Sequence, residues 1–134
     1  MRTLPNVPAD NAPSRATVLV IDPEPLYRWF VTESLAGCDV DVMASASIED
    51  AAACLRLSGS VDLLIADGEL LLGSGQSLRL LRERAGATPF VVLDADGDLS
   101  RQGLGDATIV AKPVDSAAVV SLVTRELRRN VATH

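Results

Sequence analysis

The sequence has few of the residues that most often perform nucleophilic or metal chemistry. It contains one histidine, His134, which is the last residue, and two cysteines, Cys38 and Cys54, which share no short-spaced motif. A catalytic triad needs a histidine between a nucleophile and an acid, and a zinc site needs several clustered cysteines or histidines. We therefore exclude triad-type hydrolysis and zinc binding, and expect both cysteines to be small core or near-core residues in a reducing compartment.

Basic residues and long apolar runs are also scarce. The formal net charge is −6, and the only basic cluster is Arg125, Arg128 and Arg129. These arginines lie near the C-terminal end of a predicted helix, where positive charge stabilises the helix. Nucleic-acid binding needs clustered Lys and Arg, so we expect no direct nucleic-acid partner. No apolar run approaches the ~20 residues that span a bilayer, and residues 1–15 lack an apolar signal core. We predict a cytoplasmic protein without membrane contact, with that segment as a flexible leader and one domain over residues 16–131.

Short apolar runs alternate with helical patterns along the chain. Aromatic residues make up only 3% of the sequence, so Leu, Val, Ile and Ala must form the core. Short apolar strands that alternate with helices are typical of a parallel sheet covered on both faces. We predict strands at about residues 17–21, 39–43, 61–66, 90–93 and 108–111, and helices at about residues 25–36, 48–58, 76–85 and 115–130.

Two stretches that contain glycine predict irregular connections. Residues 68–75 are predicted to form a loop. Residues 95–108 contain three glycines and almost no apolar periodicity, and each glycine costs about 1 kcal/mol in a helix interior. The fourth helix of the fold is therefore expected to be short or irregular, with one or two turns around residues 98–102.

Charged residues follow four of the predicted strands. Asp22, Asp67 and Asp94 come directly after the first, third and fourth strands, and Lys112 follows the fifth. Because the carboxyl ends of parallel strands meet at one edge of a sheet, these side chains are expected to form one site. Three acids against one lysine leave a surplus of two negative charges, which a divalent cation would balance.

With these residues in these positions, the chain resembles the receiver domains of two-component response regulators over about residues 17–129. The resemblance is carried by Val20-Ile21-Asp22-Pro23-Glu24-Pro25-Leu26, by Asp62-Leu63-Leu64-Ile65-Ala66-Asp67 with Gly75 eight residues later, and by Lys112-Pro113. It implies an α/β fold, a flavodoxin-like three-layer sandwich. The five-stranded parallel sheet of that fold has the order 2-1-3-4-5, with helices on both faces.

The resemblance also assigns roles to the charged residues. It implies that Asp67 accepts a phosphoryl group from a histidine kinase or phosphotransfer protein, that Lys112 pairs with this group, and that Asp94 stands at the usual Ser or Thr position. A carboxylate can attack phosphorus when a metal and a fixed cation neutralise the developing negative charge. The implied metal is Mg²⁺, held by Asp22, Asp67 and the backbone carbonyl of Glu69, with Glu24 as a further candidate.

Three residues depart from the family pattern. Pro23 replaces a second acid after the first strand, which lowers the charge available to a metal. Asp94 replaces a hydroxyl that could donate to a phosphoryl oxygen, whereas an ionised carboxylate only accepts hydrogen bonds and repels the group. Ile109 replaces an aromatic residue that moves inward in the family when the phosphoryl group binds. These departures predict a weakened Mg²⁺ site and impaired or atypical activation.

Two hypotheses of function follow, and neither makes the chain an enzyme. In the leading hypothesis, a receiver-like domain of two-component phosphorelay signalling accepts phosphate at Asp67 and acts on a downstream protein, or keeps this pocket as a vestige. In the alternative, a pseudo-receiver binds partner proteins without phosphorylation. A flavodoxin-like enzyme or flavin carrier fits less well, because it needs Ser- or Thr-rich phosphate turns where this chain has residues 22–25. A homodimer through the last strand and helix stays open.

Overall fold

The computed structural model describes most of the chain, namely residues 15–58, 60–72, 75–95 and 107–132. Two predictions lie outside these ranges: the leader, apart from Arg15, and the short helix around residues 98–102. Within the described ranges, no helix is long and apolar enough to cross a membrane.

Five parallel strands form one sheet in the order β2-β1-β3-β4-β5. Neighbouring strands are joined in parallel register along the whole sheet, so their carboxyl ends lie at the same edge. This sheet confirms the predicted fold class and strand order. The strands are β1 Ala16–Ile21, β2 Val40–Ser45, β3 Leu63–Asp67, β4 Phe90–Asp94 and β5 Thr108–Ala111.

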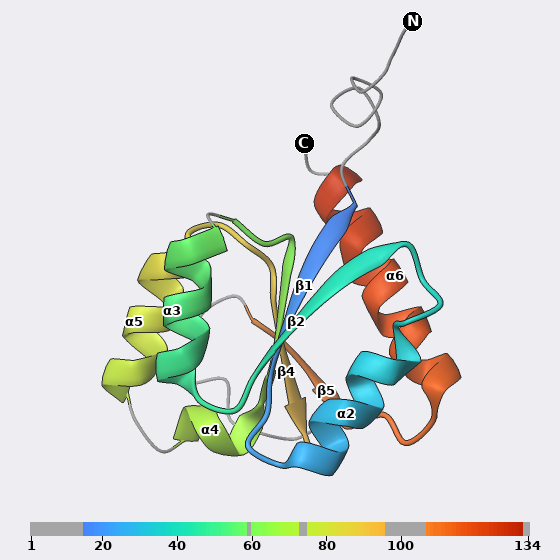
Figure 1. The fold of residues 1–134 in the computed structure, drawn as a ribbon, viewed down its shortest axis with the longest axis horizontal. Coiled ribbons are helices and arrows are strands. Elements are labelled where there is room, and N and C mark those ends of the chain that lie inside the picture. Colours follow the sequence, from blue (N-terminus) through green and yellow to red (C-terminus); the bar gives the residue numbers. More distant parts are fainter. Residues whose placement is uncertain (1–14, 59, 73–74, 96–106, 133–134) are drawn as a thin grey trace, which may run out of the picture.

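Helices cover both faces of the sheet, so the domain has three layers (Figure 1). The helices α2 and α6 pack on one face, and α3 and α5 pack together on the other. The short helix α4 directly follows β3 at the edge where the strands end. The helices are α2 Pro25–Ser34, α3 Ile48–Ser58, α4 Gly68–Leu72, α5 Gly75–Ala85 and α6 Ser116–Ala132.

Polar side chains mark where the helices begin. The Oγ atom of Ser47 accepts a hydrogen bond from the backbone N of Asp50 at 3.1 Å. The Oδ1 atom of Asp115 likewise accepts from the backbone N of Ala118 at 2.8 Å, at the start of α6. Each of these caps satisfies a backbone N–H that has no partner inside the helix.

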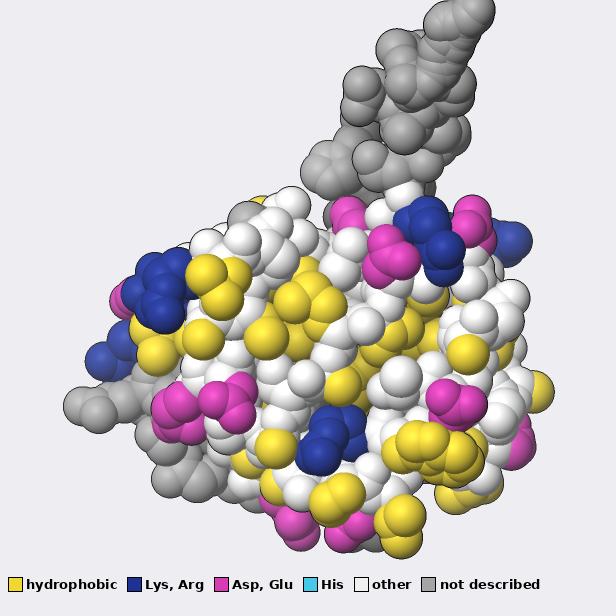
Figure 2. All heavy atoms as spheres, viewed as in Figure 1, with side chains coloured by type: hydrophobic (Ala, Val, Ile, Leu, Met, Phe, Trp, Pro, Cys, Tyr) yellow, Lys and Arg dark blue, Asp and Glu magenta, His cyan; other side chains and the backbone are white. Residues whose placement is uncertain are grey.

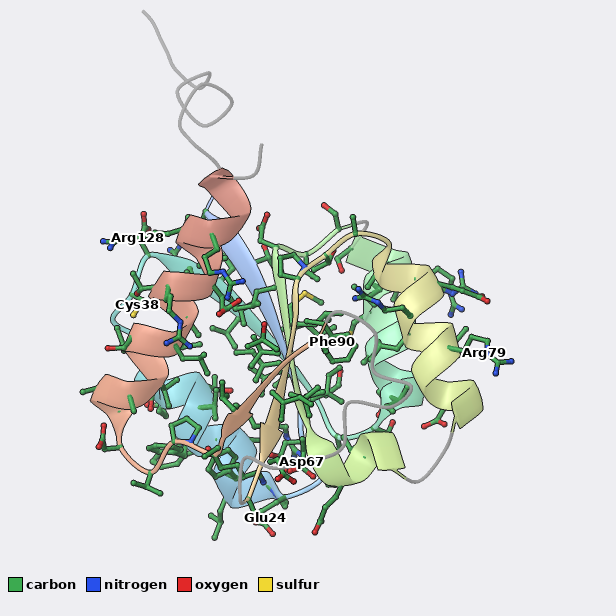
Figure 3. All side chains as sticks on the ribbon, turned by 180° about the vertical axis from the view of Figure 1, so that it is seen from behind. Glu24, Cys38, Asp67, Arg79, Phe90 and Arg128 are labelled. Atoms are coloured by element: carbon green, nitrogen blue, oxygen red, sulfur yellow. The ribbon has the colours of Figure 1, made fainter. Side chains whose placement is uncertain are left out.

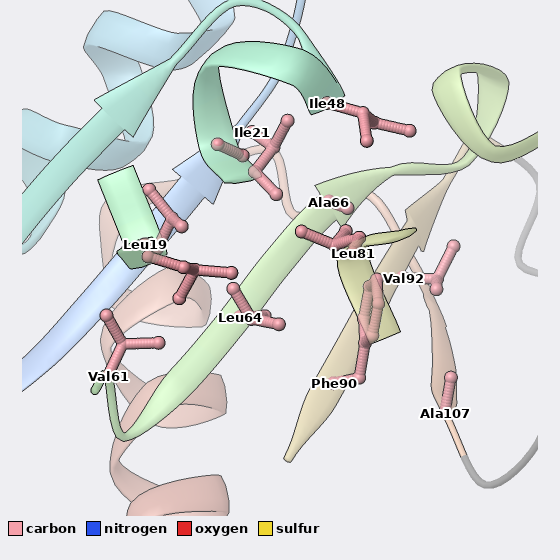
Figure 4. Packing of buried hydrophobic residues seen from close by; sticks show 12 residues of the cluster. Leu19, Ile21, Ile48, Val61, Leu64, Ala66, Leu81, Phe90, Val92 and Ala107 are labelled. Carbon is pink, nitrogen blue, oxygen red and sulfur yellow. The ribbon is translucent and has the colours of Figure 1, made fainter. Parts of the chain in front are cut away.

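Alternate residues of the strands point to opposite faces, so each central strand contributes to two cores. On β1, Leu19 and Ile21 pack toward α3 and α5, whereas Val18 and Val20 pack toward α2 and α6. All four side chains are at most 2% exposed. Figure 4 shows the first of these clusters, which joins β1, β3 and β4 to α3 and α5.

The loop predicted for residues 68–75 is wrong, because residues 68–72 form α4. Most residues of α4 are leucines, which favour a helix, but an element of 5 residues is too short to show a helical period. The strand β3 begins at Leu63, two residues later than predicted. The preceding Asp62 instead accepts a hydrogen bond from the backbone N of Thr17 at 2.7 Å through its carboxylate.

Candidate functional site

The carboxyl ends of three strands bring three of the candidate residues together. Asp22 directly follows β1, Asp67 ends β3, and Lys112 directly follows β5. Figure 3 shows Asp67 at this edge of the sheet, close to the turn that carries Glu24. The end of a parallel sheet is where open α/β folds place their ligands, so this edge is the candidate site.

Lys112 pairs with two buried carboxylates at this edge. Its Nζ atom lies 2.7 Å from Oδ1 of Asp67 and 3.6 Å from Oδ2 of Asp22. The side chains of Asp67 and Asp22 are 5% and 3% exposed, whereas that of Lys112 is 25% exposed. Two carboxylates facing one ammonium group leave this cluster with a surplus of one negative charge.

Backbone contacts hold Asp22 in place. Its Oδ1 atom accepts a hydrogen bond from the backbone N of Glu24 at 2.8 Å, and its backbone O accepts one from Nη1 of Arg28 at 2.7 Å. Burial raises the pKa of Asp22, and the charge of Asp67 adds to the rise, while the Glu24 N–H and Lys112 oppose it. Burial is the largest of these contributions, and it outweighs the opposing effects of the Glu24 N–H and of Lys112.

Tyr27 is a site residue that the sequence did not reveal. Its hydroxyl donates to the backbone O of Pro113 at 2.7 Å, and its ring centroid lies 4.5 Å from Nζ of Lys112. Burial and the charges of Asp22 and Asp67 raise the pKa of Tyr27 to about 12. Burial by itself lowers the pKa of Lys112. The hydrogen bond to Asp67 and the charges of Asp22 and Asp67 outweigh this effect, so the net shift of the Lys112 pKa is upward. In the sequence, the only indication that Tyr27 belongs to the site was its position in the first helical turn after Asp22.

Asp94 and Ile109 lie on the neighbouring strands of this edge. Asp94 ends β4, and its backbone O accepts a hydrogen bond from the backbone N of Lys112 at 2.9 Å. Its side chain is half-buried. Ile109 on β5 is also half-buried and packs against the core cluster on the α3 and α5 face. The roles that the resemblance assigns to these two positions stay predictions.

The donor set at this edge fits a hard divalent cation such as Mg²⁺. Asp22 and Asp67 supply two carboxylates, and Glu69 lies in the first turn of α4 with an exposed side chain. The carboxylate of Glu24 accepts from the backbone N of Leu26 at 3.0 Å and caps α2. In the described part of the chain, no three acidic, histidine or cysteine side chains gather into a metal site. One or two carboxylates with water suffice for Mg²⁺, and Asp22 and Asp67 supply two. The binding of Mg²⁺ and the role of the Glu69 carbonyl stay predictions.

A hollow of about 470 Å³ adjoins Lys112. Val114, which lines it, is 88% exposed, and Leu26 and Trp29 on α2, the helix that also carries Tyr27 and Phe30, are 76% and 63% exposed. Figure 2 shows apolar side chains on the surface over α2. Apolar side chains gathered on a surface are typical of a protein contact. The hollow is lined by Tyr27, Phe30, Ala95, Lys112, Pro113 and Val114.

Comparison of sequences alone finds nothing similar: no protein-family model matches the chain, and no curated protein matches it. Comparison of structures finds receiver proteins. A response regulator receiver protein from Sinorhizobium medicae has a TM-score of 0.71 and 23% identity, over 87% of this chain and 98% of that one. A CheY-like receiver domain protein from Methanospirillum hungatei has a TM-score of 0.73 and 16% identity, over 90% and 100% of the two chains.

The chemotaxis response regulator CheY4 of Vibrio cholerae is similar in the same way, with a TM-score of 0.69 and 19% identity, over 84% of this chain and 99% of that one. At such identities a structural likeness establishes the fold. The chain therefore has the fold of response regulator receiver domains.

Proposed function

We propose that this chain is a receiver-like module of two-component signalling, in which Asp67 accepts a phosphoryl group from a histidine kinase or phosphotransfer protein. One observation carries the proposal: within a receiver fold, a buried carboxylate at the end of the third strand lies 2.7 Å from the ammonium group of the lysine after the fifth. This pair places a nucleophile beside a fixed cation.

The reaction needs no chemistry beyond these groups and a bound cation. A carboxylate oxygen of Asp67 attacks the phosphorus of a phosphohistidine, a P–O bond forms, and the P–N bond to the donor histidine breaks. Lys112 offsets the negative charge that develops on the phosphoryl oxygens. Asp22, Asp67 and the backbone carbonyl of Glu69 would hold Mg²⁺, which when bound neutralises phosphoryl oxygens and orients the group for in-line transfer.

The proposed activation is atypical, because the residues that usually report phosphorylation differ here. A carboxylate at Asp94 cannot donate a hydrogen bond to a phosphoryl oxygen. Ile109 lacks the ring that would move to follow such a bond. Pro23 brings no side-chain oxygen to the metal. Of the two residues that follow β1, Asp22 therefore supplies the carboxylate, and this carboxylate also contacts Lys112.

The surroundings of the site suit a protein as the phosphoryl donor. Val114 lines the hollow that adjoins Lys112, and α2, which supplies Tyr27 and Phe30 to this hollow, also carries the exposed side chains of Leu26 and Trp29. Burial of apolar side chains supplies much of the affinity of protein contacts, and large aromatic residues often dominate it. A donor protein that covers these residues would bring its phosphohistidine to the open side of Lys112.

The experiment is phosphorylation with a small donor. Wild-type protein is incubated with Mg²⁺ and acetyl phosphate, and intact mass is followed with time. We expect the mass of one phosphoryl group to be added to wild type, and none to the matched variant Asp67→Asn. The double variant Pro23→Asp/Asp94→Thr should accumulate more of the modified form, because it restores a metal ligand and a donor hydroxyl. Equal modification of wild type and Asp67→Asn would refute Asp67 as the acceptor.

A pseudo-receiver is the second candidate, and Asp94 favours it, because a carboxylate at the end of β4 repels a phosphoryl group. The ion pair between Lys112 and Asp67 holds the unmodified site together, so the fold can present a fixed surface to a partner without phosphorylation. If neither acetyl phosphate nor a beryllofluoride mimic binds wild type, and the double variant gains no binding, the interaction module is the better description.

A further inference from the structure

Lys112 is the only lysine in the chain; all other basic side chains except His134 are arginines. Its ammonium group is contacted from three directions, by Asp67 at 2.7 Å, by Asp22 at 3.6 Å and by the face of the Tyr27 ring at 4.5 Å from the centroid. The two acids explain why a cation stands here. They do not explain what keeps a flexible side chain that is 25% exposed from turning to solvent.

We propose that Tyr27 is a positioning residue for Lys112, which holds the ammonium group against Asp67. The ring face attracts the cation and forms an apolar wall beside it. The hydroxyl of the same residue donates to the backbone O of Pro113 at 2.7 Å, and Pro113 is the next residue after Lys112. One side chain thus fixes both the tip of Lys112 and the backbone that carries it.

The position of Tyr27 is itself well fixed. It lies in the first turn of α2, whose start is set by Pro25 and capped by the carboxylate of Glu24. Its ring is tilted against that of Phe30, with centroids 5.4 Å apart. The ring therefore offers a rigid surface to a mobile cation, which lowers the number of positions that the lysine can occupy.

The consequence for phosphoryl transfer rests on the proposed function. A fixed cation stabilises the charge that develops during the reaction, whereas a mobile one must first be ordered. Loss of the Tyr27 ring should therefore slow modification of Asp67 without changing the Mg²⁺ concentration at half-maximal rate, because Tyr27 does not belong to the proposed metal ligands. A change that merely loosened the fold would alter both quantities.

The first test reads the position of Lys112 and does not depend on phosphorylation. Selective isotope labelling of lysine gives a single set of side-chain NMR signals, because the chain has one lysine. The εCH₂ protons should be shifted upfield by the ring current in wild type and in Tyr27→Phe, and the shift should vanish in Tyr27→Leu. Trp29→Leu, which removes an exposed aromatic from the same helix, should leave the shift in place. Absence of the shift in wild type overturns the proposal without any variant.

The second test measures the rate of Asp67 modification by acetyl phosphate. Tyr27→Leu should be slower by about fivefold, the factor that corresponds to a cation–π contact of about 1 kcal/mol. Tyr27→Phe should recover most of the rate, because it keeps the ring. If Tyr27→Leu loses the ring-current shift but reacts as fast as wild type, the catalytic part of the proposal is wrong. If wild type shows the shift but is never modified, the positioning contact stands and the proposed phosphorylation fails.

Discussion

Lys112 is the counter-charge of two buried carboxylates, and its removal should destabilise the protein strongly. The variant Lys112→Met keeps most of the side-chain volume and leaves Asp22 and Asp67 without their ammonium partner. Breaking a fully buried ion pair costs about 3–5 kcal/mol. Because the side chain of Lys112 is 25% exposed, we expect a smaller loss, of about 2–3 kcal/mol in the free energy of unfolding at neutral pH.

The charge balance of the cluster predicts the opposite effect for Asp67→Asn. Wild type has a surplus of one negative charge, and this substitution leaves Asp22 and Lys112 as a neutral pair. The amide oxygen that the substitution introduces can still accept a hydrogen bond from Lys112. We expect stability without metal to rise by about 1 kcal/mol, since repulsion by Asp67 is one cause of the raised pKa of Asp22. The double variant Lys112→Met/Asp67→Asn should be less destabilised than Lys112→Met alone.

The loss in Lys112→Met should depend on pH in a defined direction. The pKa of Asp22 is raised above 3.8 in the folded state, so between 3.8 and its raised value the folded state binds more protons than the unfolded state. Stability from this group therefore increases as pH falls through that window. Lys112 opposes the raised pKa of Asp22, so its removal extends the window upward. The deficit of Lys112→Met should shrink from about pH 7 to about pH 5.

Urea denaturation followed by circular dichroism at both pH values measures these differences. Arg79→Met is the matched control, because it removes one positive charge from an exposed side chain on α5, far from Asp67 in Figure 3. This control should change stability by no more than about 0.5 kcal/mol. If Lys112→Met is as stable as wild type at neutral pH, or if its loss of stability grows on acidification, the unpaired charge of the buried acids does not control the stability of this cluster.

Three further predictions concern the packing around the site. Tyr27 is the only tyrosine, so the absorbance of tyrosinate should titrate at a pH of about 12 in the folded protein and at 10.0 in denaturant. The free energy of unfolding should then fall as pH rises between these values, because only the unfolded state has lost the proton. Leu64→Ala removes a side chain that is 0% exposed and should cost about 2–5 kcal/mol in urea denaturation, whereas Leu57→Ala, at a position 84% exposed, should cost less than about 0.5 kcal/mol. Asp115→Ala removes the cap of α6 and should lower the free energy of unfolding by about 0.5–2 kcal/mol, with recovery in Asp115→Ser.

The strands and the main cluster could be predicted because simple rules govern both. Runs of Leu, Val and Ile that are buried on both faces indicate strands of a parallel sheet, and the carboxyl ends of such strands meet at one edge. Asp22, Asp67 and Lys112 satisfy these rules without any knowledge of side-chain packing. The helix α4 could not be predicted, because an element of 5 residues is too short for a periodic signal.

Tyr27 shows where sequence reasoning ends. Its hydroxyl reaches a backbone oxygen 86 residues later, and no local pattern reports such a contact. The contact depends on how α2 lies across the sheet, which follows from the packing of Val31 and Leu35 against the α6 side of the core. Asp94 illustrates the same limit, because the sequence shows its charge but not that its backbone O accepts a hydrogen bond from the backbone N of Lys112.

Cation binding and phosphoryl binding at this cluster should be coupled, because either charge alone leaves the site unbalanced. Asp22, Asp67 and Lys112 have a net charge of one negative unit, and a beryllofluoride adduct on Asp67 adds another. A divalent cation alone would reverse the sign, whereas both ligands together bring the cluster to neutrality. We therefore expect Mg²⁺ and beryllofluoride to strengthen each other's binding by the same factor, since such coupling is reciprocal. Calorimetric titration of each ligand with and without the other measures both factors, and Asp67→Asn should abolish them. Affinities for Mg²⁺ that do not change with beryllofluoride would mean that charge balance does not control this site.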